Sequence, residues 1–294
     1  MNAVRGFVRL TAVFGAVSLA VVGCSGAGSA GDDEANVVAA DCEPAASVTT
    51  IEPGTLSVGA YAYPPYSDPE NASEPGIELE ILQRFAEENC LALDVNNVSA
   101  AARVESVRTG RADLGAGSLI RTKKRAEVVG LSDPIMLQPY GVASPDGKIA
   151  TVEDLIDSRI GVTEGWAITP QLKELLGDSL SVYQATAPAY RDLQTGRIDG
   201  VIDTVAAAKA AVQAGAAAED VEVKELAPDP RLKWTTEPAA QTALIYDQSA
   251  TSLGTALNSF IADLRADGTL DEIVSEYGLP ESQAHPGEPI LADR

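Results

Sequence analysis

Two stretches of the chain repeat one pattern of helix, turn and strand. They are residues 104–113 and residues 190–199. In each stretch a helical segment is followed by Thr-Gly-Arg, one apolar residue and an aspartate that opens a strand. A glycine directly after a helix suits the left-handed residue with which many helices end. The repeat therefore predicts two similar α/β lobes in one chain.

Strand and helix patterns alternate around both copies of the repeat. Around the first copy we expect strands at 55–59, 91–95 and 112–116 and helices at 76–85 and 101–109. Around the second copy we expect strands at 159–162, 181–183, 198–202 and 221–223 and helices at 152–156, 165–176, 187–195 and 205–214. A strand at 242–246 and helices at 253–266 and 269–277 follow. This rhythm is typical of right-handed parallel β/α units, and the extra C-terminal helices favour two hinged lobes over one sheet.

The N-terminus has the features of a secretory signal. Arg5 and Arg9 precede an apolar core at about 10–22, which is too short to remain as a membrane-spanning helix. The run Val-Val-Gly-Cys that ends at Cys24 resembles the lipobox of bacterial lipoproteins, in which the cysteine is lipidated and becomes the new N-terminus. The alternative is an ordinary cleaved signal with a chance cysteine. We expect residues 1–23 to be removed and at least two acyl chains on Cys24 to anchor the protein stably, which one chain does not.

The remaining cysteines are Cys42 and Cys90. An oxidising compartment permits them to form a disulfide, which would close a loop of 48 residues. The alternative is two separate buried thiols.

Residues 24–49 are dominated by Gly, Ala, Ser and acidic residues, so they predict a flexible tether between the lipid and the folded body.

Composition limits the class of protein and its partners. The chain has 294 residues, 45% of them hydrophobic, which is enough for one large two-lobed unit or two domains with real cores. Its formal charge of −22 repels phosphate backbones and argues against a nucleic-acid partner. The only histidine is His285, and no spacing of residues suggests a metal site or a cofactor.

Several motifs follow one another in an order that resembles a known family. They are 54–59 with Tyr-Pro-Pro-Tyr at 63–66, Gly-Ile-Glu-Leu-Glu at 76–80, Thr-Gly-Arg-Ala-Asp-Leu at 109–114, the run 121–126 with Leu-Ser-Asp-Pro at 131–134, Gly-Arg-Ile-Asp at 196–199 with Asp203, and the run 266–273. Together these motifs resemble the family 3 extracellular solute-binding proteins of ABC importers, most of which serve polar amino acids. The resemblance covers residues 53–279.

The resemblance implies a fold. It is α/β and two-lobed, the periplasmic-binding-protein-like (type II) fold, with a double-crossover hinge and a central cleft that closes on its ligand. We expect lobe 1 at residues 50–140 plus 243–280 and lobe 2 at residues 141–242, with crossings near 140–143 and 240–243. Residues 281–294 are expected to form a polar tail.

The resemblance also implies how a ligand is held. An amino acid brings a carboxylate and an ammonium into a partly dry cleft, where each needs a partner. Arg125 matches the family arginine whose planar guanidinium holds the carboxylate; the alternative is a solvated arginine in a basic run. Gly117 and Ser118 match the loop that lends backbone N–H and hydroxyl groups to the same carboxylate. We expect Thr122 to cap the helix that carries Arg125 rather than to touch the ligand.

Aspartates and tyrosines divide between ligand and structural roles. Asp203 matches the lobe 2 aspartate that pairs with the ammonium, whereas Asp199, which Asp113 repeats, is expected to be structural. Tyr63 matches an aromatic residue that covers the ligand side chain, and a ring face also suits a cation. Packing of the proline-rich loop is the alternative for Tyr63 and for Tyr66.

Three positions depart from the family pattern. Ile120 stands where the family usually has Thr or Ser, and Ala60 replaces an acidic residue in the first loop. A Gly-Thr pair at a helix start is Gly165-Trp166 here. That helix start still offers N–H groups to an anion, and Trp166 either lines the ligand pocket or packs the lobe. These changes predict a more aromatic and less polar side-chain pocket.

Three functions fit these features. The first is a lipid-anchored, extracytoplasmic binding protein, monomeric and without a cofactor, that delivers an amino acid or related small zwitterion to an ABC permease and its ATPase. The second is an enzyme on the same fold, a dehydratase or cell-wall lyase, for which Glu78, Glu164 and Asp203 are the nearby acid–base candidates. The third is a sensor that reports its closed form to a membrane partner. No catalytic constellation is evident in the sequence, which favours binding over catalysis.

Overall fold

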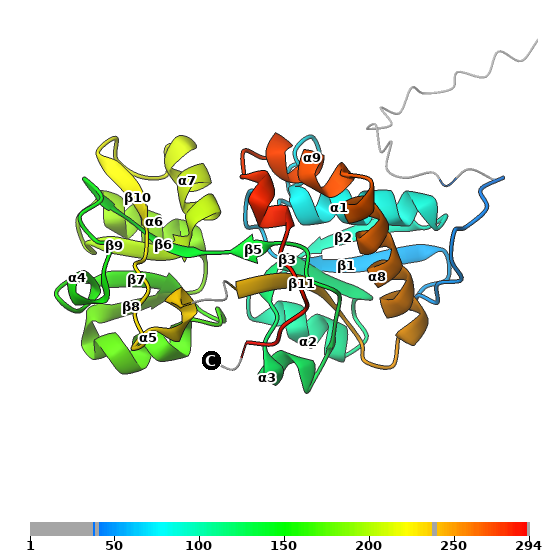
Figure 1. Ribbon diagram of the computed structural model, residues 1–294, viewed down its shortest axis with the longest axis horizontal. Helices are drawn as coiled ribbons and strands as arrows, with labels where there is room; N and C mark the ends of the chain where they lie inside the picture. The colour runs from blue at the N-terminus through cyan, green and yellow to red at the C-terminus, as the bar shows by residue number, and fades with distance from the viewer. Residues whose placement is uncertain (1–37, 39–40, 237–239, 293–294) are drawn as a thin grey trace, which may run out of the picture. The chain divides into compact units, whose positions relative to one another are not determined.

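Two β-sheets organise the chain, and helices surround each of them (Figure 1). The computed structural model describes residue 38, residues 41–236 and residues 240–292. The expected signal peptide, Cys24 and most of the expected tether lie outside the described residues. Within the described ranges no helix is both long enough and apolar enough to span a bilayer.

The first sheet has six strands in the order β2-β1-β3-β11-β4, with β5 also paired to β11. Its strands are β1 (Thr55–Ala60), β2 (Ala92–Asn97), β3 (Leu114–Ile120), β4 (Gly130–Leu131), β5 (Leu137–Gln138) and β11 (Ala240–Tyr246). Its helices are α1 (Ile77–Glu88), α2 (Ala102–Arg108), α3 (Lys123–Ala126), α8 (Thr251–Ala266) and α9 (Thr269–Glu276). The strands β1, β2 and β3 run parallel, whereas β11 is antiparallel to its neighbours. We call this sheet with its helices lobe 1.

The second sheet has five strands in the order β10-β6-β9-β7-β8. Its strands are β6 (Tyr140–Pro145), β7 (Ile160–Thr163), β8 (Leu180–Tyr183), β9 (Gly200–Thr204) and β10 (Val221–Glu225). Its helices are α4 (Val152–Ile156), α5 (Thr169–Leu176), α6 (Thr186–Gln194) and α7 (Val205–Gln213), with short 3₁₀ turns η1 (Gly177–Ser179) and η2 (Lys233–Thr235). We call this sheet with its helices lobe 2.

The sequence repeat has the same structural role in both lobes. In lobe 1 the carboxylate of Asp113 accepts the backbone N–H of Ser57 in β1, at 2.9 Å. In lobe 2 the carboxylate of Asp199 accepts the backbone N–H of Arg159 just before β7, at 2.8 Å. Each aspartate joins the start of the third β/α strand to the start of the first. The structural role expected for Asp199 is therefore confirmed.

The central strands are buried along their whole length. Every residue of β3 and every residue of β9 is buried, as expected for strands covered by helices on both faces. Both strands lead directly to residues singled out in the sequence. The strand β3 is followed by α3, which carries Arg125, and β9 contains Asp203.

The chain passes from the first sheet to the second between β5 and β6. Gln138 pairs with Ala240 in the first sheet, while Tyr140 already pairs with Thr204 in the second. Pro139 therefore marks the first crossing, and β11 of the first sheet begins at Ala240. The ribbon passing from β5 to β6 can be followed in Figure 1. Proline has no N–H and a fixed φ, so it suits a position between two ladders rather than inside one.

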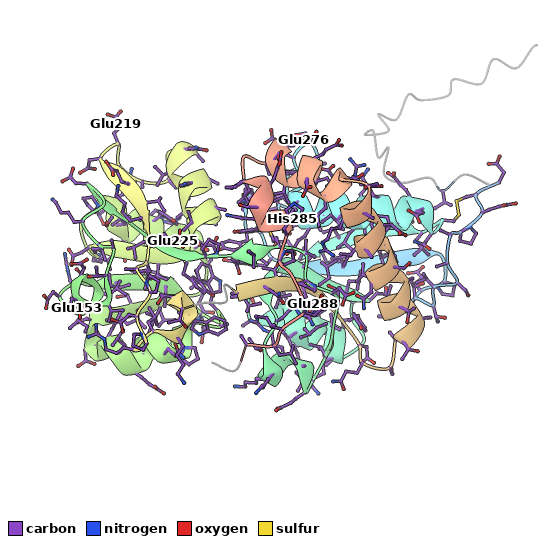
Figure 2. The ribbon with its side chains drawn as sticks, in the orientation of Figure 1. Glu153, Glu219, Glu225, Glu276, His285 and Glu288 are labelled. Atoms are coloured by element: carbon purple, nitrogen blue, oxygen red, sulfur yellow. A yellow bond between two sulfur atoms is a disulfide. The ribbon has the colours of Figure 1, made fainter. Side chains whose placement is uncertain are left out.

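A disulfide joins Cys42 to Cys90, with Cα atoms 5.8 Å apart (yellow bond in Figure 2). Backbone N–H groups next to it also bond the end of α1: Ala45 donates to Glu88 and Ala46 donates to the Asn89 side chain. The last residues of the expected tether, from 41 onward, are thus attached to lobe 1. The pairing of cysteines predicted from the sequence is present.

Residues 281–292 of the expected polar tail pack against lobe 1. A 3₁₀ turn, η3 (Glu281–Ala284), follows α9, and Ala284 and Ala292 are buried. The side chain of Arg121 donates to the carbonyl of Ile290. The Nε2 atom of His285 (labelled in Figure 2) lies 3.1 Å from Oδ1 of Asp271. The sequence suggested little of this because the segment is short, rich in proline and without periodicity.

Removing the disulfide should lower stability without changing the ligand site. We expect the double variant Cys42→Ser, Cys90→Ser to lose about 2–4 kcal/mol of unfolding free energy, because the closed loop restricts the unfolded chain. Urea denaturation of the oxidised wild type and the variant measures the difference. A variant as stable as the wild type would show that the hydrogen bonds near Asn89 hold the segment by themselves.

Candidate functional site

Arg125 projects from α3 at the end of the central strand of lobe 1. Thr122 caps this helix, as predicted, by accepting the backbone N–H of Arg125 at 3.1 Å. The Arg125 guanidinium donates through Nη1 to the carbonyl of Ile120 at 2.7 Å and through Nη2 to the carbonyl of Gly165 at 3.5 Å. Gly165 belongs to lobe 2, so this guanidinium spans the two lobes.

A small cavity lies beside Arg125, between the lobes. Lobe 1 contributes Tyr63, Arg103, Gly117, Ser118, Ile120, Arg125 and Gln138, and lobe 2 contributes Tyr140, Trp166, Ala167 and Thr204. The cavity measures about 10 Å³, room for about one water molecule. Arg125 and Trp166 also line a neighbouring open groove of about 750 Å³. A ligand larger than water must therefore separate the lobes or move side chains.

The N–H groups of Gly117 and Ser118 already have a partner within lobe 1. Both donate to the carboxylate of Glu78 in α1, at 2.6 Å from Gly117 and 3.0 Å from Ser118. Burial raises the pKa of Glu78 to about 7, although these bonds and the charge of Arg103 oppose the shift. The sequence does not show that Glu78 faces this loop, so its bonds to these N–H groups were not expected. Gly117 and Ser118 still line the cavity, and the Ser118 hydroxyl accepts a bond from Gln138.

Asp203 is on the opposite lobe from Arg125, as expected, but its carboxylate is covered. The hydroxyl of Tyr63 in lobe 1 donates to it, the backbone N–H of Thr204 donates at 2.7 Å, and the hydroxyl of Tyr190 lies at 3.3 Å. Burial raises the pKa of Asp203 to about 7 against the effect of these donors. Asp203 itself does not line the cavity. It joins the lobes through Tyr63 instead of presenting an open anion.

Aromatic rings fill the space between the lobes. The Trp166 ring of lobe 2 lies 5.3 Å from the Tyr63 ring of lobe 1, centroid to centroid. The hydroxyls of Tyr63 and Tyr66 each lie 3.1 Å from that of Thr204. Tyr66 is fully buried and outside the cavity lining, so packing is its role here, whereas Tyr63 and Trp166 both line the cavity.

The departures from the family pattern leave apolar walls. Ile120 and Ala60 are buried, and Ile120 lines the cavity while its carbonyl accepts from Arg125. Gly165 precedes a turn, and α5 begins only at Thr169, with proline in its first turn. The carbonyl of Gly165, rather than an N–H group at a helix start, faces Arg125.

Sequence reasoning missed a second arginine. Arg103 in α2 is only 2% exposed and lines the same cavity. Its Nε donates to the carbonyl of Ala100 at 3.2 Å, and its Nη1 donates to the carbonyl of Gly117. Its guanidinium carbon lies 5.3 Å from the centroid of the Tyr61 ring. The signal was an arginine in the first turn of a helix whose other charged residues, Glu105 and Arg108, are exposed.

The site therefore combines two guanidinium groups with neutral walls. Burial, together with the nearby charge of Arg125, lowers the pKa of Arg103 to about 10. Burial also lowers the pKa of Arg125. Both remain cations at neutral pH, so the arrangement can bind acidic groups. Among the described residues no group of three or more His, Cys, Asp or Glu is placed to hold a metal ion.

Residues 56–280 match the bacterial extracellular solute-binding proteins, family 3. The chain belongs to this family. No curated protein matches this solute-binding protein by sequence.

Solved structures resemble this solute-binding protein at low sequence identity. A mutant of ArgBP from T. maritima is 21% identical over 76% of this chain and 95% of that chain, with a TM-score of 0.67. AbpA from Streptococcus pneumoniae, bound to L-arginine, is 22% identical over 76% of this chain and 94% of that chain, with a TM-score of 0.67. The ancestral amino acid-binding protein AncCDT-1, a precursor of cyclohexadienyl dehydratase, is 20% identical over 76% and 95%, with a TM-score of 0.66. The shared fold is the two-lobed type II fold that the motifs implied.

The buried carboxyl of Glu78 should make stability depend on pH. Because its folded-state pKa of about 7 exceeds the ordinary 4.5, the folded protein binds more protons than the unfolded chain between these values. The unfolding free energy therefore falls as pH rises through this window, by up to about 1.4 kcal/mol per pH unit for this group. Asp203 contributes in the same direction.

Replacing Glu78 by glutamine should remove its share of that slope. We expect the unfolding free energy of Glu78→Gln, measured by urea denaturation from pH 4.5 to 7.5, to decline less steeply than that of the wild type. Glu88→Gln, on an exposed position of the same helix, should keep the wild-type slope. Equal slopes for wild type and Glu78→Gln would mean that Glu78 stays ionised throughout.

Proposed function

We propose that this protein captures an amino acid or related small zwitterion between its lobes and delivers it to an ABC importer. The observation that carries the proposal is the Arg125 guanidinium, which lines the interlobe cavity and reaches the carbonyl of Gly165 across it. A planar guanidinium can hold a carboxylate through two parallel hydrogen bonds. A carboxylate there would replace weaker carbonyl partners with a charged one.

A buried acceptor supports an amino group on the ligand. The Oε1 atom of Gln138 has no hydrogen-bond partner among the described residues, and Gln138 lines the cavity. An unpaired buried acceptor costs free energy, which a ligand N–H donor would recover. Asp203 can reach an ammonium as well if the hydroxyl of Tyr63 gives way, and opening of the lobes separates those two groups.

The enzyme alternative has one observation in its favour. The pKa values of Glu78 and Asp203 are both raised to about 7, and perturbed carboxyls often mark acid–base sites. Neither carboxyl lines the cavity, however, and each is fully buried and occupied by protein donors. A general acid or base must come within hydrogen-bond reach of its substrate. Binding without catalysis therefore fits this geometry better.

We propose further that the protein acts as a monomer outside the cytoplasm, anchored to the membrane through lipid on Cys24, with a permease and ATPase as partners. Membership of an extracellular solute-binding family supports the compartment. The Cys42–Cys90 disulfide supports it as well, because such bonds persist mainly in oxidising surroundings. A sensor that reports to a membrane partner remains the second reading, and genes for a permease or a kinase beside this one would distinguish the two.

Removing the Arg125 guanidinium should abolish recognition of carboxylates. We expect thermal-shift measurements over the common amino acids to show at least one stabilising ligand for the wild type. For Arg125→Ala that shift should disappear, with affinity reduced about 100-fold or more because a charged pair is lost. Arg84→Ala, which breaks an exposed ion pair on α1, is the matched control and should keep the shift. An undiminished shift in Arg125→Ala would remove Arg125 from the site.

Lipid on Cys24 should decide where the protein is found. Expressed in a bacterium that processes lipoproteins, the full chain should sediment with membranes and incorporate radiolabelled palmitate, because two or more acyl chains anchor stably. Cys24→Ser should do neither, whereas the variant lacking Cys42 and Cys90 should still do both. A soluble, unlabelled wild type would contradict the lipid anchor.

A further inference from the structure

Arg103 is a second buried cation, and a ligand with a single carboxylate on Arg125 would leave it without an anionic partner. It shares the cavity with Arg125, and one carboxylate on Arg125 satisfies only one of the two guanidiniums. A buried charge needs a charged or strongly polar partner to offset the loss of water. Among the described residues, Arg103 and Arg125 have only carbonyl oxygens as hydrogen-bond partners, and neither forms an ion pair within 4.0 Å.

We infer that the cleft is built for a ligand with two acidic groups, one held by Arg125 and the other by Arg103. This rests on the proposed function, and it names the class of ligand: an acidic amino acid or a short dicarboxylate. The shared chemistry is a pair of carboxylates a few carbon atoms apart. Arg103 then determines specificity, in addition to the recognition of one carboxylate by Arg125.

The guanidinium of Arg103 has N–H donors that its hydrogen bonds to the described residues do not use. It carries five N–H donors, and its hydrogen bonds to protein use only Nε and Nη1. The Nη2 group has no hydrogen-bond partner among the described residues. Glycine at position 117 makes room for the guanidinium, because a Cβ there would lie 2.9 Å from Nη1. The Tyr61 ring holds the charge from one side without neutralising it.

The charge balance inside the cleft also favours an anionic ligand. Glu78 accepts the N–H of Gly117, whose carbonyl Arg103 bonds, and Asp203 accepts from Tyr63 on the other lobe. Burial raises the pKa of each to about 7, so neither carboxyl carries a full negative charge at neutral pH. The two guanidiniums therefore leave the cleft positive.

The outer groove extends this positive region. Lys124, Lys173 and Arg125 line it together with Glu127 and Glu164. Elsewhere the chain is strongly acidic, with a formal charge of −22. A cleft of one sign on a surface of the other attracts ligands of opposite charge and raises their rate of association.

The direct test compares acids with their amides on the unmodified protein. Isothermal titration with L-glutamate, L-glutamine, L-aspartate, L-asparagine and glutarate should show each acidic amino acid binding about tenfold or more tightly than its amide, because a charged hydrogen-bond pair is lost in the amide. Glutarate, which lacks the amino group, distinguishes a dicarboxylate site from an acidic amino acid site. If both amides bind as tightly as their acids, and glutarate does not bind, the inference about Arg103 is wrong.

Variants at Arg103 separate ligand recognition from a structural role. Arg103→Gln should lose about tenfold or more in affinity for the preferred acid while its affinity for the amide changes less than about threefold, and Arg103→Lys should restore part of the preference. Arg108→Gln, on the exposed face of the same helix, should behave as the wild type. Equal losses for acid and amide would show that Arg103 only supports the loop at Gly117. If Arg103→Gln fails to fold, the comparison on the wild type decides alone.

The two proposals fail in different ways. Tight binding of neutral amino acids that depends on Arg125 would keep the proposed function and overturn the inference about a second acidic group. If none of the common amino acids and neither glutarate nor succinate binds, the proposed function fails together with it.

Discussion

Two guanidinium groups lie between the lobes with neutral carbonyl oxygens as their hydrogen-bond partners. Arg125 bonds the carbonyls of Ile120 and Gly165, and Arg103 bonds those of Ala100 and Gly117. Holding two cations in so little water is unfavourable unless a charged partner is near. The buried carboxyls, the glycine at position 117 and the aromatic walls are all arranged around this excess of positive charge.

The positions of these groups follow from the two sheets. Parallel β/α units bring the ends of central strands to one edge of each sheet, where ligands commonly bind in open α/β folds. Here β3 leads into the helix that carries Arg125, and β9 ends at Asp203 and Thr204. The hydroxyls of Tyr63 and Tyr66 bond Asp203 and Thr204 from the other lobe. The crevice is therefore lined by cations on one side and closed by hydroxyl and ring contacts on the other.

Much of the fold could be predicted because it depends on local patterns. The repeat at 104–113 and 190–199 predicted equivalent units, and its aspartates bond equivalent strand starts. The apolar face of α1 and the cap at Thr122 also followed from spacing. The strands β4, β5 and β6 were missed, because their pairing with β9, β10 and β11 depends on contacts distant in sequence. The polar tail was predicted, but not its packing on lobe 1, because the segment is short, rich in proline and without periodicity.

The site was harder to predict because the hydrogen-bond partners of its N–H and charged groups come from residues distant in sequence. Arg125 and Trp166 could be picked from motifs, and both line the cavity. Whether an N–H group of Gly117 is free depends on Glu78, which is 39 residues earlier in the chain. The role of Arg103 depends on its burial, which a single arginine in a short helix does not reveal. Sequence motifs predicted which residues lie near the cleft. Only the contacts in the structure show which of these residues already have hydrogen-bond partners within the protein.

A crystal structure of the protein grown with L-glutamate tests the account most directly. We predict density for the ligand between the lobes, with one carboxylate at about 2.7–2.9 Å from the Arg125 guanidinium nitrogens and the other at a similar distance from Arg103. A ligand held in the cleft with Arg103 still bonded only to carbonyl oxygens would contradict the second acidic group. Density for the ligand away from both arginines would contradict the account as a whole.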